Sequence, residues 1–154
     1  MDFNKDKYII VEIIPDHSNS NLGKICQVQA LKLEGLNLID RFDYRLSKDK
    51  IDNIAILKAI DYDNDSFKYT FDSDTILNDF KSWCEDYNLL LIEPNYTFDY
   101  LKDISNYKEL VYPYLNMKHS YNVFNEMIDK YHLEPSNHLV DLVYEAIIQE
   151  VGRK

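Results

Sequence analysis

Cysteine and histidine are the side chains that most readily bind a metal ion or act as nucleophile and base, and this sequence has few of them. Cys26 and Cys84 are far apart and form no C-x-x-C or cysteine–histidine pattern. This spacing favours two small core residues in a reducing compartment over a structural zinc site. His17, His119 and His132 share no ligand-like spacing either, so we expect them in loops or at helix ends.

Three further residues have side chains that could serve one site, namely Glu12, Asp99 and His138. Carboxylates bind hard cations, and histidine often acts as a general base. Each residue also has a purely structural interpretation. Glu12 can be a glutamate at the end of a strand, Asp99 a residue in the first turn of a helix, and His138 a cap or contact of the last helix. The residue types alone leave both interpretations open.

The first part of the chain has the pattern of an antiparallel meander. Residues 8–14 are rich in Ile and Val, as in a buried strand, and turn-forming residues follow them. Residues 24–33 alternate loosely between apolar and polar, and residues 36–46 return as a third strand after a Glu-Gly turn. The charged stretch 47–72 then predicts only one or two helical turns, at residues 54–57.

The rest of the chain predicts helices around one more buried strand. Asp74 can cap a helix whose apolar residues share one face, at positions 76, 77, 80, 83, 84 and 87. The apolar run 89–92 follows it as a parallel strand. The remaining expected elements are a helix at 98–104, an edge strand at 110–114, a helix capped by Ser120 and a last helix from about Pro135 to Val151. This order predicts an α/β fold with a ribonuclease H-like mixed sheet, in which three antiparallel strands and further parallel strands carry helices on their faces.

Length and composition indicate the class of protein. With 154 residues, of which 45% are apolar, the chain is expected to form one domain over residues 1–154. A charged N-terminus and Glu12 in the apolar run that follows argue against a signal peptide or a membrane span, so we expect a soluble, cytoplasmic protein. The net charge of -10 argues against a broad phosphate-binding surface. It fits either a solvated acidic surface or an acidic face for a basic protein partner.

Several short motifs follow one another along the chain in an informative order. The YIIVEII run at residues 8–14 is similar to a first strand, and Asp40-Arg41-Phe42 to the end of a third strand. The PNYTFD run at residues 94–99 is similar to His-Asn-x-x-Phe-Asp, and His138 introduces the final helix as a His-x-x-x-x-Asp motif does. With these motifs the chain resembles the DnaQ-like (DEDDh) 3'-5' exonucleases of the ribonuclease H-like fold, from Tyr8 to about Glu150.

The resemblance implies a nuclease site with two metal ions. In that family four carboxylates hold two Mg or Mn ions that clamp the scissile phosphate, and a histidine acts as general base toward the attacking water. By position in the motifs, Asp99 matches a metal ligand at the start of a helix, His138 the general base, and Glu12 a carboxylate of the first strand. The residues expected to line the adjoining substrate groove are Asn95, Tyr96 and Tyr100.

Two of the family's carboxylates are missing from this sequence. The family has Asp-x-Glu on its first strand, and the matching triplet here is Glu12-Ile13-Ile14, which places an aliphatic residue in one ligand position. Five residues after His138, where the family has its last Asp, the chain has Val143. Asp16 could loop back as a substitute, although a turn aspartate is its ordinary interpretation. Asp141 points about 200° away from Val143 around the helix and would require the helix to rotate or shift.

These patterns leave three hypotheses. The first is a catalytically inactive exonuclease-like domain that binds a protein partner, with no cofactor or with Mg or Mn bound weakly at Glu12 and Asp99. The second is a weak or unusual metal-dependent 3'-5' exonuclease on single-stranded DNA or RNA, which requires Asp16 or Asp141 to converge with Asp99. The third is an acidic inhibitor or nucleic-acid mimic that occupies a basic groove of another protein. We take the first as the working prediction.

Overall fold

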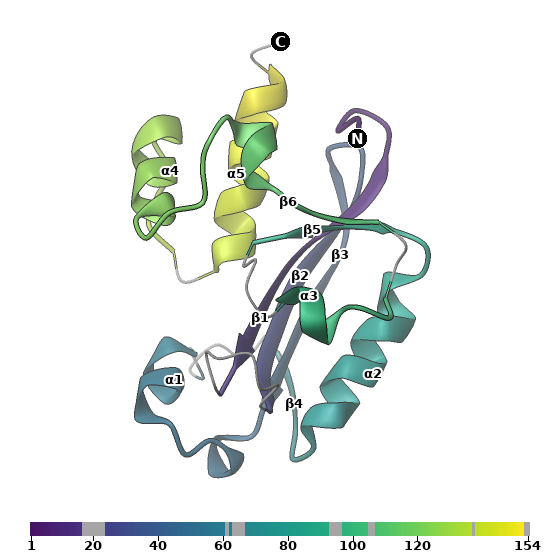
Figure 1. Ribbon diagram of the computed structural model, residues 1–154, viewed down its shortest axis with the longest axis vertical. Helices are drawn as coiled ribbons and strands as arrows, with labels where there is room; N and C mark the ends of the chain where they lie inside the picture. The colour runs from purple at the N-terminus through teal and green to yellow at the C-terminus, as the bar shows by residue number, and fades with distance from the viewer. Residues whose placement is uncertain are drawn as a thin grey trace.

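The computed structural model describes residues 1–16, 24–60, 62, 67–92, 97–104, 107–136 and 138–152. Its centre is a six-stranded mixed sheet with the strand order β4-β3-β2-β1-β5-β6, and helices flank this sheet (Figure 1). The fold is therefore α/β with a ribonuclease H-like mixed sheet, as the sequence predicts. None of the helices among the described residues is long and apolar enough to cross a membrane.

Three long antiparallel strands form the middle of the sheet. They are β1 (Lys7–Pro15), β2 (Ile25–Glu34) and β3 (Asn37–Leu46), so the predicted meander is confirmed. The turn between β2 and β3 requires a glycine. Gly35 has φ 61°, and a Cβ atom there would lie 2.8 Å from the backbone oxygen of Asn4.

The outer strands run parallel to their neighbours. β5 (Asn88–Leu91) pairs with β1, β6 (Lys108–Leu110) pairs with β5, and β4 (Lys68–Thr70) pairs with β3. The predicted buried parallel strand at 89–92 is thus confirmed as β5. β4 was missed, because a three-residue strand at the edge of a sheet leaves no apolar periodicity in the charged stretch around it.

The helices of the described chain are α1 (Ile54–Ala59), α2 (Ser73–Cys84), α3 (Thr97–Tyr100), α4 (Val123–Tyr131) and α5 (Leu139–Gly152), with 3-10 turns at Lys48–Lys50 and Tyr112–Leu115. Asp72 rather than Asp74 caps α2, because its side chain accepts the N–H of Asp74. Asn122 rather than Ser120 stands at the N-cap position of α4. The edge strand predicted at 110–114 is mostly the second 3-10 turn, since Pro113 has no N–H to donate to a ladder.

The helices cover both faces of the sheet, which produces two apolar clusters. α4 and α5 lie over one face and α2 over the other (Figure 1). Because side chains alternate along a strand, Ile10 of β1 belongs to the cluster under α4 and α5, whereas its neighbour Ile9 belongs to the cluster under α2. Both side chains are completely buried. Burial on both faces explains why β1 is an apolar run, interrupted by Glu12, in the sequence.

The two cysteines are buried in the cluster under α2, as the sequence predicts. Burial raises the pKa of the Cys26 thiol and of the Cys84 thiol to about 12. We therefore expect the native protein to react with Ellman's reagent at about pH 8 at least a hundredfold more slowly than the urea-unfolded protein, in which both thiols are exposed. A fast native reaction at either thiol would show that the surrounding element opens readily.

Candidate functional site

A row of polar side chains crosses the sheet on the face that α5 covers. Glu12 on β1 lies opposite Gln29 on β2, and Gln29 lies opposite Asp43 on β3. Since neighbouring strands are about 4.8 Å apart, the row spans roughly 10 Å. It is nearly buried, with 9% of Glu12 and 7% of Gln29 exposed. The row begins where the apolar residues of β1 on this face, such as Ile10, give way to Glu12.

His138 reaches this row from the start of α5. Its Nδ1 lies 3.0 Å from Nε2 of Gln29, and its carbonyl oxygen accepts the N–H groups of Asp141 and Leu142 in the first turn of the helix. An amide nitrogen can only donate, so Nδ1 of His138 accepts, and a neutral ring then has its proton on Nε2. Neither ring nitrogen retains a free lone pair in this arrangement. The structure thus brings Glu12 and His138 to one row, with Gln29 between them.

A buried ion pair occupies the β3 end of the row. The completely buried guanidinium of Arg45 donates to Asp43 through Nε at 3.0 Å and through Nη2 at 2.9 Å. Gln27 donates to the same carboxylate at 3.2 Å, and the ring of Phe67 lies 4.0 Å from the guanidinium carbon. Among the residues that the structure describes, Nη1 of Arg45 has no hydrogen-bond partner. A fixed cation therefore already offsets the charge of Asp43.

Val143 and Asp141 on α5 are the two positions considered for the last metal-binding carboxylate of the exonuclease family. Both make other contacts. Val143 is completely buried in the cluster under α4 and α5. Asp141 lies in the first turn of α5, and its two carboxylate oxygens accept from Arg41 at 2.8 and 3.2 Å. This ion pair holds Asp141 toward β3.

The remaining predicted site residues that the structure describes, Asp99 and Tyr100, lie on α3 and not on the elements that form the row. Asp99 is exposed on α3, and Tyr100 packs in the cluster under α2 instead of presenting its ring to a groove. Asn95 and Tyr96 lie outside the described residues. The N–H of Asp16 donates to the carbonyl oxygen of Lys24 at 3.0 Å, as in a residue that closes a loop between two strands.

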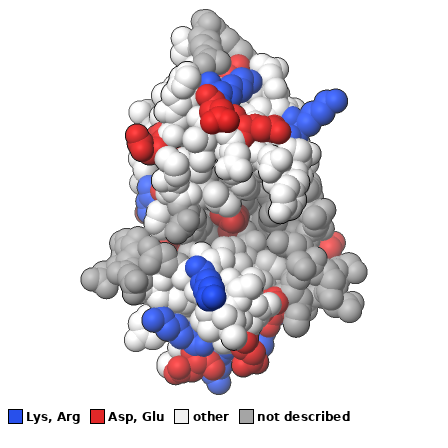
Figure 2. All heavy atoms as spheres, turned by 90° about the vertical axis from the view of Figure 1, so that its left-hand side faces the viewer, with Lys and Arg blue, Asp and Glu red and all other residues white. Residues whose placement is uncertain are grey.

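The described part of the chain contains no group of three or more His, Cys, Asp or Glu residues placed to hold a metal ion. On the side of the molecule that carries α4 and α1, the surface is hollowed between its upper and lower parts, and acidic atoms lie in the hollow (Figure 2). The side chains of the polar row offer hydrogen-bond donors and acceptors on this face of the sheet.

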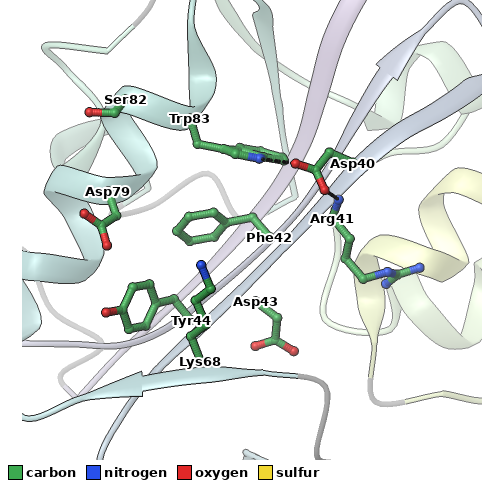
Figure 3. Close-up of a pocket in the computed structure, with 9 residues that line it drawn as sticks. All are labelled: Asp40, Arg41, Phe42, Asp43, Tyr44, Lys68, Asp79, Ser82 and Trp83. Carbon is green, nitrogen blue, oxygen red and sulfur yellow. Dashed lines mark hydrogen bonds between the residues drawn. The ribbon is translucent and has the colours of Figure 1, made fainter.

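A separate cavity of about 440 Å³ lies between β3, β4 and α2 (Figure 3). Asp40 holds one of its walls together, because it accepts from the indole N–H of Trp83 at 2.9 Å and from the backbone N–H of Arg41 at 2.8 Å. β4 pairs with residues 44–46 of β3, so the edge of β3 near Asp40 is not covered by β4. The Asp40 carboxylate accepts the backbone N–H of Arg41 on this edge. Such a contact protects an open strand edge from pairing with another chain.

The contact between Asp40 and Trp83 predicts a pH dependence. The hydrogen bond from Trp83 lowers the pKa of the Asp40 carboxyl, and the N–H of Arg41 and nearby lysines act in the same direction. Its stabilising effect is therefore present above the unfolded value of about 3.9 and is lost as the pH falls through the lower pKa of the folded state. Trp83 is the only tryptophan. We expect its fluorescence to titrate below about pH 3.9. Asp40→Asn should lack that transition, and an unchanged titration in this variant would contradict the assignment.

Comparisons with protein-family models and with curated proteins give no relative for this chain. No protein-family model matches it, and no curated protein matches it. The functional residues are therefore interpreted from their geometry: a histidine held by an amide, an aspartate held by a buried arginine, and a carboxylate on the central strand.

Proposed function

We propose that this chain is a catalytically inactive domain of the DnaQ-like exonuclease type that serves as a binding module for a protein partner. The contact between His138 and Gln29 is the observation that carries the proposal. A general base needs a free lone pair to take a proton from water. Nδ1 uses its lone pair for the Gln29 amide at 3.0 Å, and the neutral ring has its proton on Nε2.

The electrostatics of the polar row support the same proposal. Two close divalent cations need several carboxylates to offset their charge. Of the two carboxylates in the row, Glu12 and Asp43, the second is already neutralised by Arg45 and cannot also offset a bound ion. Asp141, the substitute considered for the last ligand, is held by Arg41.

The charge of the chain favours a protein over a nucleic acid as the partner. Much of the affinity for nucleic acids comes from Lys and Arg side chains that neutralise phosphates and release their counterions. A protein with a net charge of -10 repels the phosphates instead. The same charge speeds encounters with a basic protein and discriminates against acidic ones. The domain thereby keeps the fold of a nuclease and uses its surface for binding.

A nuclease assay tests the catalytic half of the proposal. The purified protein is incubated with end-labelled single-stranded DNA and RNA in Mg²⁺ or Mn²⁺, beside the variants Asp99→Ala and Asp103→Ala. Asp103 is a matched control because it is another exposed aspartate just beyond α3. We expect every substrate to remain intact with all three proteins. Stepwise 3' shortening that Asp99→Ala abolishes and Asp103→Ala retains would establish the exonuclease alternative instead.

A further inference from the structure

A second surface feature runs along the outside of α5. It is a cavity of about 540 Å³ whose lining includes Glu134 in the loop before the helix, Asp141, Tyr144, Glu145 and Ile148 on the helix, and Arg41 on β3. We call this cavity the α5 groove. It contains none of the residues of the polar row, so it is a distinct site. From Asp141 to Ile148 the helix rises by about 10 Å, which is long enough for two turns of a bound helix.

The first half of β3 runs beside this groove, and Arg41 lines the groove from that strand. Two contacts fix β3 beside α5: Arg41 pairs with Asp141, and the hydroxyl of Tyr144 donates to the carbonyl of Leu36 at 2.8 Å. Figure 3 shows Arg41 extending from β3 toward α5. Leu38 lies on β3 between these two contacts, on the side of the sheet that α5 covers.

Apolar side chains are exposed in the groove and beside it. Ile148 lines the groove, whereas Leu38 and Ile39 lie on β3 outside its lining. Leu38 on β3 is 40% exposed, Ile39 beside it is 51% exposed, and Ile148 on α5 is 39% exposed. Leu38 lies opposite Leu33, which belongs to the cluster under α5, and this register places Leu38 on the same face. An exposed apolar strip of this kind marks a surface that another chain covers.

The charges around the strip specify what can cover it. The lining contains two more carboxylates than cations. Asp141 is satisfied by Arg41, whereas Glu134 and Glu145 are exposed and form no ion pair within the described chain. Excess carboxylates beside an apolar strip are complementary to a segment that carries apolar residues and basic residues together. A second copy of this chain has a net charge of -10 and is repelled, as is a phosphate backbone.

We propose that the α5 groove binds a basic amphipathic segment of a protein partner. Its apolar side chains cover Leu38 and Ile148, and its Arg or Lys residues lie beside Glu134 and Glu145. The inference rests on the proposed function and deepens it by giving the surface and the chemistry of the partner.

A synthetic peptide serves as the probe. One fluorescein-labelled peptide has Leu and Arg at helical i, i+4 spacing, and a second has Glu in place of each Arg. Fluorescence anisotropy at about 150 mM salt, where distant charges are screened, measures binding. We expect the wild-type protein to bind the Leu/Arg peptide and not the Leu/Glu peptide. The double variant Glu134→Lys/Glu145→Lys should bind about tenfold more weakly, and Ile148→Ser about fivefold more weakly.

A matched variant separates the groove from overall charge. Asp103→Lys/Asp129→Lys makes the same change in net charge at two exposed residues that do not line the groove. This control should bind the Leu/Arg peptide within about twofold of wild type. The inference is overturned if wild type fails to bind, if the control loses as much affinity as the groove variant, or if Ile148→Ser binds like wild type. Failure here combined with an inactive protein in the nuclease assay rejects the groove and leaves the proposed loss of catalysis standing.

Discussion

Arg45→Met is expected to lower the free energy of unfolding by about 3–5 kcal/mol, because it leaves the nearly buried Asp43 carboxylate without its cation. Arg45 is completely buried and makes two hydrogen bonds to Asp43. The change also removes the guanidinium that packs against the ring of Phe67. Urea unfolding followed by circular dichroism measures the loss as a lower midpoint at an unchanged slope.

Two controls show whether burial causes this effect. Asp43→Leu/Arg45→Met removes both charges, and it should recover at least about 2 kcal/mol relative to Arg45→Met. Arg41→Met removes the more exposed ion pair between Arg41 and Asp141. It should lower the free energy of unfolding by less than about 1 kcal/mol. If Arg45→Met and Arg41→Met were equally mild, the buried ion pair at the end of the polar row would be refuted.

Val143→Asp is expected to destabilise the protein by about 3–5 kcal/mol and to create no nuclease activity. Under the proposed resemblance to the DnaQ-like exonucleases, Val143 takes the place of a metal-binding aspartate. Here Val143 is completely buried in the same cluster as Tyr8, Ile10 and Ala146, so a carboxylate there loses its hydration without gaining a metal. Urea unfolding and the 3' shortening assay give the two measurements.

Ile148→Asp is the matched control for this prediction. It also places an aspartate at a β-branched position of α5, but Ile148 is exposed, so the cost should be below about 1 kcal/mol. A Val143→Asp variant as stable as wild type would mean that this side chain is not enclosed in the apolar cluster under α4 and α5. Residue 143, the fifth after His138, would then be accessible to a metal ion, as in the exonuclease family. The proposed loss of the metal site would be wrong.

The long elements of the sheet could be predicted from the sequence because their signals are local. β1 is an apolar run interrupted by Glu12, β5 contains the apolar run 89–91, and a Glu-Gly turn separates β2 from β3. β4 could not be predicted, since its place is set by pairing with β3 and not by its own three residues. The cap of α2 was misplaced because Asp72 and Asp74 are both suitable residue types, and only the backbone shows which side chain accepts the N–H.

The candidate site was predictable only in part. The motif order indicated Glu12 and His138, but not that Gln29 would lie between them, since that contact depends on strand register and on the docking of α5. A usable signal was nonetheless present. Gln27 and Gln29 on one buried strand, and Asp43 and Arg45 on the next, are polar at alternate positions, which places each pair on one face of the sheet.

The most direct check is an NMR titration of the histidine ring resonances with Mn²⁺, a paramagnetic ion that broadens nuclei close to it. Exposed His132 at the end of α4 serves as the internal reference for ions that are not bound at the row. We predict that the resonances of His138 broaden no earlier than those of His132, because Asp43 of the polar row is neutralised by Arg45 and cannot share a metal ion with Glu12. Selective broadening of His138 at low Mn²⁺ would contradict this account, because it would show that a metal ion binds at the row.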